Sequence, residues 1–289
     1  MAQSGRFISF AQNGEDVVLN RVLGNLPIGT YVEVGANHPR IDSVSRSFYE
    51  RGWSGIAIEP NPAYAALYRE ERPRDRVIEA AVADSSDAMV TLHLIEGTGL
   101  STLVDSISRD HSRNGRIVVD VTVPTIRLDE AIEANGLTGS EIHFLLVDTE
   151  GAELQVLRSI DLTRVRPWIL VIEATAPESI IATHTSWEPI LLAAGYRFCL
   201  FDGLSRFYVA EEKSDELAGR LSYPTCVFDN FVSIEQVRIE NEFESLKIEL
   251  AKSRQSLASS EYEVNDLRNS RSWRLTRPIR ALHKLLGPH

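Results

Sequence analysis

The fold of this chain is decided by the stretch Tyr31-Val32-Glu33-Val34-Gly35-Ala36-Asn37-His38-Pro39. Its first four residues are rich in β-branched and aromatic character, which predicts a buried parallel strand cut short at Gly35. Because glycine has no Cβ, the chain turns sharply there and a ligand would lie against bare backbone. An acid inside an apolar strand is costly unless it is paired. We therefore interpret Glu33 as a ligand-binding carboxylate; the alternative is an acid that pairs with a neighbouring Arg or Lys.

The same pattern, an apolar run closed by an acid, recurs along the chain between helix-like segments. The later runs are 55–59, 77–84, 142–148 and 167–173, and they end in Glu59, Asp84, Asp148 and Glu173. Alternating strands and helices predict a parallel sheet with helices on both faces and ligands at the carboxyl ends of the strands. The acids should therefore gather along one edge of the sheet. A hairpin across Asp202-Gly203 adds one antiparallel strand.

Two further positions are candidates for ligand binding. Glu59 follows Gly35 by 24 residues, near the roughly 20-residue offset at which a Rossmann-type unit places an acid on ribose hydroxyls. The alternative is a surface carboxylate in a loop. Gln12 lies in an N-terminal segment that would reach over the ligand as a lid, or would form part of a helix cap.

The composition excludes several classes of protein. The net charge of −11 argues against nucleic acid as the main partner, because phosphate neutralisation needs a basic surface. Cys199 and Cys226 have no metal-ligand spacing, so we expect small buried hydrophobic residues in a reducing, cytoplasmic compartment. No stretch approaches the roughly 18 apolar residues of a membrane span.

The composition changes from about Asp229, and no strand pattern remains. Apolar residues then alternate by four and three, which predicts a coiled coil over residues 232–268. The seam positions are Ile239, Phe243, Leu246, Leu250, Ser253, Leu257, Ser260, Val264 and Leu267. We expect the coil to join chains into a homo-oligomer. The alternative is a single amphipathic helix folded back on the domain.

The last segment, residues 269–289, is a basic amphipathic tail. No acid follows Arg268, while basic and apolar residues interleave to the end of the tail. The basic residues are Arg271, Arg274, Arg277, Arg280 and Lys284, and the apolar ones are Trp273, Leu275, Ile279, Leu282, Leu285 and Leu286. Such a tail would bind anionic lipid at the inner face of a membrane or a partner protein. The alternative is a basic end that balances an acidic coil.

Several spaced motifs in order now go beyond a generic Rossmann-like sheet. They are Ala11-Gln12-Asn13-Gly14-Glu15-Asp16, Val34-Gly35-Ala36-Asn37, Phe48-Tyr49-x-x-Gly52-Trp53, Ile58-Glu59-Pro60-Asn61, Val147-Asp148-Thr149-Glu150-Gly151-Ala152-Glu153 and Asp202-Gly203-Leu204-Ser205-Arg206-Phe207-Tyr208. From Ser9 to about Phe231 the chain resembles the FkbM family of S-adenosylmethionine (SAM)-dependent O-methyltransferases, and we expect residues 1–231 to form a domain of this kind. It departs from that family at His38-Pro39, where many members have a further glycine. The tail motif 272–278 is similar to the ends of bacterial surface-polysaccharide glycosyltransferases.

The resemblance implies a class I methyltransferase sheet with SAM at its carboxyl edge. Glu33 would hold the amino group of the cofactor, and Gly35 and Asn37 would lie under its methionine part. Glu59 would take both ribose hydroxyls. Asp84, together with the backbone at Val82, would meet adenine, and Gln12 would close over the cofactor.

The resemblance also implies methyl transfer to a hydroxyl, here of a sugar or glycan in cell-surface polysaccharide biosynthesis. Asp148 would stand where the methyl group points, with Glu150 beside it. His38 has the ordinary pKa of a base at neutral pH, or else it is a histidine that caps its own loop. As an alternative, Asp148, Glu150 and Glu173 would hold a divalent cation such as Mg²⁺ for a diol acceptor.

Three competing functions are weighed against this one. A nicotinamide-dependent oxidoreductase is disfavoured because the first turn lacks the three-glycine dinucleotide fingerprint. A sugar-nucleotide glycosyltransferase is disfavoured by the lack of an Asp-x-Asp motif. A non-catalytic coiled-coil assembly subunit is disfavoured because an acid follows each predicted strand of the parallel sheet.

Overall fold

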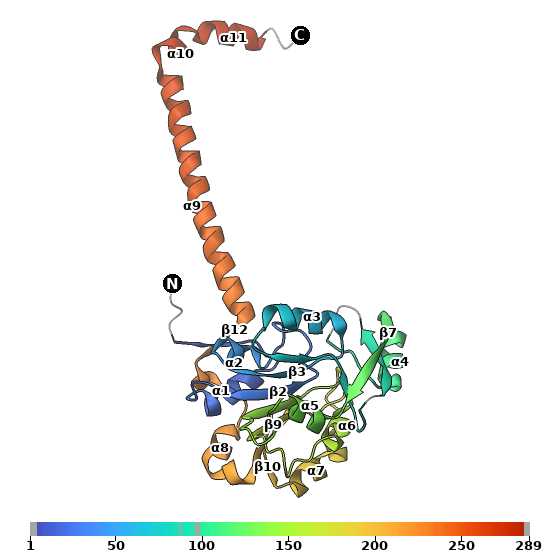
Figure 1. Ribbon diagram of the computed structural model, residues 1–289. Helices are drawn as coiled ribbons and strands as arrows, with labels where there is room; N and C mark the ends of the chain where they lie inside the picture. The colour runs from blue at the N-terminus through green and yellow to red at the C-terminus, as the bar shows by residue number, and fades with distance from the viewer. Residues whose placement is uncertain (1–4, 87, 96–98, 286–289) are drawn as a thin grey trace. The chain divides into compact units, whose positions relative to one another are not determined.

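The computed structural model describes residues 5–86, 88–95 and 99–285, with the side chains of 283–285 left aside. The chain divides into two compact units, Met1–Ser233 and Ile234–His289. The first holds the sheets and most of the helices, and the second is helical (Figure 1). Leu286 of the predicted basic tail lies outside the described residues.

The first unit is built on a seven-stranded sheet in the order β10-β11-β9-β8-β2-β3-β4. These strands are β2 (Thr30–Val34), β3 (Ser54–Ile58), β4 (Arg76–Ile78), β8 (Phe144–Val147), β9 (Ile169–Glu173), β10 (Tyr196–Phe201) and β11 (Ser205–Ala210). Neighbours from β4 to β9 pair in parallel, and β11 is antiparallel to both β9 and β10. The chain moves outward from β2 through β3 to β4 and returns on the other side of β2 at β8. This reversal places the topological switch point, where such sheets bind ligands, between β2 and β8.

Helices cover both faces of this sheet, as the sequence predicts. On one face Val32 and Val34 of β2 pack in a cluster with residues of α5 (Leu128–Ala134), α6 (Glu153–Arg158) and α7 (Glu188–Ala193). On the other face Tyr31 packs with residues of α1 (Glu15–Leu23), α2 (Arg46–Glu50) and α8 (Ser214–Leu221). Strand side chains alternate between faces, so Glu33 shares the face of Tyr31. The expected α/β sheet with one antiparallel strand is confirmed.

The predicted third strand, residues 77–84, is two strands in two different sheets. β4 ends at Ile78, and β5 (Ala81–Val82) pairs with β7 (Val118–Ile126), which in turn pairs with β6 (Met89–Ile95). Ala81 packs against Leu92 and Val123 of this smaller sheet. Glu79, which directly follows β4, is the one acid between the two apolar halves, and the prediction of a single strand did not take it as a break.

The remaining elements of the first unit close it. β1 (Phe7–Ser9) pairs in parallel with β12 (Phe231–Ser233). α3 (Pro62–Glu71) follows β3, and α4 (Asp105–Arg113) accompanies the three-stranded sheet. Short 3₁₀ turns lie at His184–Ser186, Glu211–Lys213 and Val227–Asp229. Cys199 and Cys226 are both free and half-buried.

The second unit consists of α9 (Ile234–Asn269), α10 (Arg271–Leu275) and α11 (Arg277–Leu285). The predicted long C-terminal helix is therefore confirmed. Its apolar seam is exposed: Ile239, Leu250 and Leu267 keep 57%, 51% and 62% of their surface accessible. Ser270 caps α10 by accepting a hydrogen bond from the Trp273 amide. Among the described helices, none is both long and apolar enough to cross a bilayer.

Candidate active site

A cavity of about 440 Å³ opens at the carboxyl ends of β2, β3 and β8, at the switch point of the sheet. The loops after these three strands contribute Gly35 and Asn37, Glu59, and Asp148 and Glu150, respectively. The segments around the smaller sheet contribute apolar side chains, including Val82, Leu92 and Leu103. The volume lies in the range of about 300–1,000 Å³ that is usual for small-molecule sites.

Gly35 is required here by the neighbouring strand as well as by the turn. Its φ is +75°, and a Cβ built on it would lie 1.7 Å from the carbonyl oxygen of Asp148. Next to this contact, the Asp148 amide donates a hydrogen bond to the Val34 carbonyl oxygen at 3.0 Å. The loops after β2 and β8 therefore approach each other more closely than any side chain permits, which brings Asp148 beside the first strand.

The Glu33 side chain is fixed by a buried network of hydrogen bonds. The carboxylate is 1% exposed, and its Oε2 accepts hydrogen bonds from Ser45 Oγ at 2.5 Å and Tyr68 OH at 3.3 Å. Arg72, which is fully buried, donates to Ser45 Oγ at 2.7 Å. Burial raises the pKa of Glu33, and the positive charge of Arg72 opposes that rise. Glu33 is thus both a paired acid and a residue of the cavity wall.

Glu59 joins two loops of the cavity. Its Oε2 accepts from the Asn37 amide at 2.6 Å, and its Oε1 accepts from the Asn61 amide at 2.7 Å. Asn37 has a φ of +51°, a conformation that Asn adopts more readily than most residues. Burial raises the pKa of Glu59 to about 7. Each carboxylate oxygen has a second lone pair, so the side chain can still accept hydrogen bonds from a ligand.

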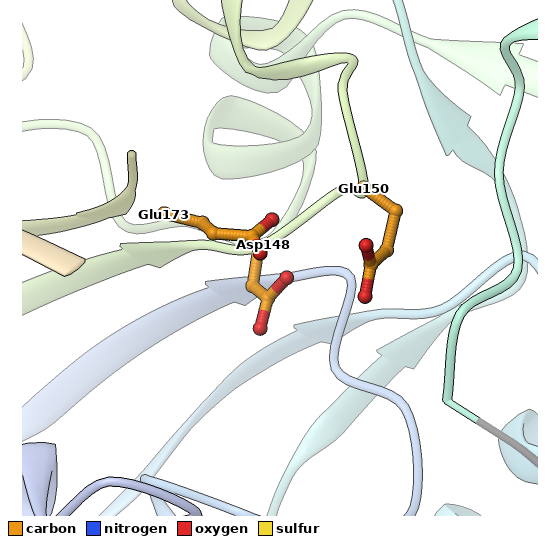
Figure 2. A group of neighbouring side chains, drawn as sticks. All are labelled: Asp148, Glu150 and Glu173. Carbon is orange, nitrogen blue, oxygen red and sulfur yellow. The ribbon is translucent and has the colours of Figure 1, made fainter. Parts of the chain in front are cut away.

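Asp148, Glu150 and Glu173 bring their carboxylates together at the ends of β8 and β9 (Figure 2). One oxygen from each lies within 4.8 Å of the others. Burial raises the pKa of all three carboxyl groups, and the charge of Asp148 raises the pKa of Glu150 and Glu173 further. Oε2 of Glu150 and Oε2 of Glu173 are buried and have no hydrogen-bond partner in the described part of the chain.

The sequence model of the FkbM methyltransferase domain matches residues 33–198, which is more than half of the chain. The chain belongs to the FkbM methyltransferase family. The matched region runs from Glu33 of β2 into β10 and contains all three acids of the cluster. The family assignment makes the chain a SAM-dependent methyltransferase.

Two solved structures of methyltransferases are among those similar to this chain. One is a TehB-like SAM-dependent methyltransferase from Corynebacterium glutamicum, with 9% identity and a TM-score of 0.37 over 69% of this chain and 88% of that chain. Another is precorrin-6y C5,15-methyltransferase from Geobacter metallireducens, with 14% identity and a TM-score of 0.36 over 72% and 92%. No curated protein sequence matches the chain.

In this FkbM-family chain most of the residues predicted for the site line one cavity. They are Gln12, Glu33, Gly35, Asn37, Glu59, Val82, Asp148 and Glu150. Glu173 lies outside the lining, in contact range of Asp148 and Glu150.

His38 and Asp84 do not reach the cavity. Nδ1 of His38 accepts from the amides of Arg40 and Ile41, both at 3.1 Å, so the ring caps its own loop. Burial also lowers the pKa of His38. Asp84 follows β5 in the smaller sheet, and its side chain is exposed. The geometry therefore supports neither a base at His38 nor an adenine contact by the Asp84 side chain; the acid at the end of β4 is Glu79, which pairs with Arg69 at 2.8 Å.

Two features of the site were not predicted. The apolar wall formed by Leu92 and Leu103 comes from β6 and the segment that follows it, and an apolar pattern does not show which surface such residues face. Glu153 shapes the loop after β8: its Oε1 accepts from the amides of Thr149 at 3.2 Å and Gly151 at 3.0 Å. The role of Glu153 could have been predicted from the Asp-x-Glu-Gly-Ala-Glu run, since an acid in the first turn of a helix meets unpaired amides.

Proposed function

We propose that this methyltransferase transfers a methyl group from SAM to a hydroxyl of a sugar or glycan. The observation that carries the proposal is the cavity at the switch point, which places Glu33 and Glu59 on one wall with Asp148 at the end of the adjacent strand. The tail motif at 272–278, which is similar to glycosyltransferase ends, supports a glycan as the acceptor.

The residues present fit SAM, which when bound supplies a methyl group activated by a cationic sulfur. Glu33 would hold the amino group, and Glu59 would accept hydrogen bonds from the ribose hydroxyls through its free lone pairs. The backbone at Gly35 and Asn37 would lie along the amino-acid part. Val82, Leu92 and Leu103 form an apolar surface suited to a purine face.

Asp148 would remove the proton from the acceptor. Methyl transfer to oxygen is an in-line displacement, so the protein contributes mainly by positioning the reactants and taking up the hydroxyl proton. The Asp148 backbone is fixed against Gly35 and Val34, which places Asp148 beside the carboxyl end of β2. The hydroxyl proton would pass to an Asp148 oxygen as the acceptor oxygen forms its bond to the methyl carbon.

Calorimetric titration with SAM, S-adenosylhomocysteine and NAD tests this assignment and its competitors together. We expect the first two to bind at one site per chain and NAD not to compete. Binding of NAD without binding of SAM would instead favour the oxidoreductase. A folded chain that binds none of the three would favour a non-catalytic assembly role.

Glu59→Gln should weaken S-adenosylhomocysteine binding at least tenfold, about 1.4 kcal/mol. A carboxylate accepts charge-assisted hydrogen bonds worth about 1.5–3 kcal/mol each, and the neutral amide cannot accept with both of its polar atoms. Calorimetry measures the affinity. Glu79→Gln is the matched control, because Glu79 follows the adjacent strand and is occupied by Arg69. Equal affinity in Glu59→Gln and wild type would refute the ribose assignment.

The affinity for S-adenosylhomocysteine should also fall as the pH drops through about 7. The free Glu59 has a pKa near 7, and ribose hydroxyls bind its ionised form better, so a proton must leave on binding below that pH. The contribution of Glu59 is thus complete above pH 7 and is lost below it. Titrations from pH 5.5 to 8 would show this slope in wild type and a shallower one in Glu59→Gln. Identical slopes in the two proteins would contradict the assignment.

A further inference from the structure

Among the described residues, no basic side chain pairs with the acids at the ends of β8 and β9, and the hydrogen bond between Asp148 and Glu173 lies within the cluster. Glu173 is 5% exposed, its Oε2 has no hydrogen-bond partner in the described chain, and its carboxylate points toward that of Asp148 (Figure 2). Oε2 of Glu150 is likewise buried and has no hydrogen-bond partner among the residues that the structure describes. Buried carboxylates are costly unless they are paired, protonated or bound to a metal.

Two arginines and two backbone amides of this region donate to acids outside the cluster. Arg116 of the cavity lining forms an ion pair with Glu178, and Arg206, on the strand beside β9, pairs with Glu188 at 2.8 Å. The amides of Thr149 and Gly151 donate to Glu153. Within residues 5–86, 88–95 and 99–282, no Lys, Arg or His makes an ion pair with the three carboxylates of the cluster.

We propose that Asp148, Glu150 and Glu173 together bind one hard divalent cation, of the class Mg²⁺, Mn²⁺ or Ca²⁺. The set offers only carboxylate oxygens, the ligands that these ions prefer. Metal–oxygen bonds of about 2.0–2.6 Å place ligands on opposite sides of an ion roughly 4–5 Å apart, and the three oxygens lie within 4.8 Å of one another. Three protein oxygens leave further coordination positions open.

The open positions give the cation a role, which rests on the proposed function. A sugar with two neighbouring hydroxyls offers two oxygens at a spacing that a cation of this class can accept together. The cation would then select a vicinal diol as the acceptor and orient it beside Asp148. Because each acid supplies one ligand oxygen, the second oxygen of Asp148 stays available for the hydroxyl proton.

The binding test uses Mn²⁺ and the full-length protein without cofactor or acceptor. Free Mn²⁺ gives a six-line electron paramagnetic resonance signal that disappears on binding, so a titration counts the sites. We expect one site per chain, weakened roughly tenfold or more in Glu173→Gln and in Glu150→Gln because each loses a charged ligand. Glu79→Gln, at the end of β4, should bind as wild type does. Circular dichroism checks that each variant is folded. If Glu173→Gln does not fold, Glu150→Gln still tests the site, because Glu150 is only partly buried.

Two results would overturn the inference. One is no Mn²⁺ binding to the wild type up to millimolar concentration, and the other is binding that both substitutions leave unchanged. Because this test contains no SAM, it is separate from the test of the proposed function. Mn²⁺ bound at the cluster of a chain that does not bind SAM would uphold the site and refute the methyltransferase assignment to this cavity.

Discussion

Asp148→Asn should lower the turnover number roughly 10²-fold or more while S-adenosylhomocysteine affinity stays close to that of the wild type. The substitution keeps the size of the side chain and the backbone contact with Gly35, so the shape of the cavity should persist. It removes the group that takes up the acceptor proton. A loss confined to the chemical step indicates a residue that acts on the reacting atoms and not on the cofactor.

Single-turnover methyl transfer and calorimetry on the same preparation measure the two quantities. Glu79→Gln is again the control, since it changes an acid at the same edge of the sheet outside the cavity lining. If affinity collapsed and the single-turnover rate did not slow, Asp148 would be a cofactor ligand only. If excess Mg²⁺ restored the rate of Asp148→Asn, the residue would act only by holding the cation.

The positions of Glu33, Glu59 and Asp148 could be predicted because they depend on a local rule. Each acid lies at or near the carboxyl end of an apolar strand, and parallel strands bring their carboxyl ends to one edge. The sequence therefore brought together residues more than a hundred positions apart. The same rule predicted that glycine is needed at position 35 to make room for a ligand. The tighter restriction is the Asp148 carbonyl oxygen, which would lie 1.7 Å from a Cβ built at this position. Such a contact depends on strand order and has no local signal.

Asp84 and His38 show where the local rule stops. Both halves of the run 77–84 are apolar on either side of Glu79, because they pack in different sheets, at Val77 beside Ala57 and at Ala81 beside Leu92. The two halves show the same apolar pattern, so the sequence predicted one strand and put Asp84 at the carboxyl edge of the seven-stranded sheet, where it does not lie. His38 has the residue type of a base, but two amides of its own loop already occupy Nδ1. The buried hydrogen-bond network of Arg72 and Glu33 connects segments at β2, α2 and α3, and no residue spacing in the sequence predicts it.

Leu250→Asp should convert an oligomer of the full chain into a monomer. The seam of α9 exposes seven apolar side chains in a heptad pattern, and a solitary helix gains little stability in water. A second copy of the same seam would bury these side chains against each other. Ser253 and Ser260 weaken the middle of the seam, so one buried charge there should be enough to prevent association. Light scattering at micromolar concentration would measure the mass.

The matched control is Gln255→Asp, which adds the same charge five residues later on the side of the helix opposite the seam. This variant should remain oligomeric. Oligomers would hold several basic tails together and raise their effective concentration at an anionic surface. Leu250→Asp should therefore lose sedimentation with phosphatidylserine vesicles while it still methylates a small acceptor, because the cavity is built from residues 12–178. A monomeric wild type would refute the coiled coil, and equal sedimentation of both proteins would show that a single tail suffices.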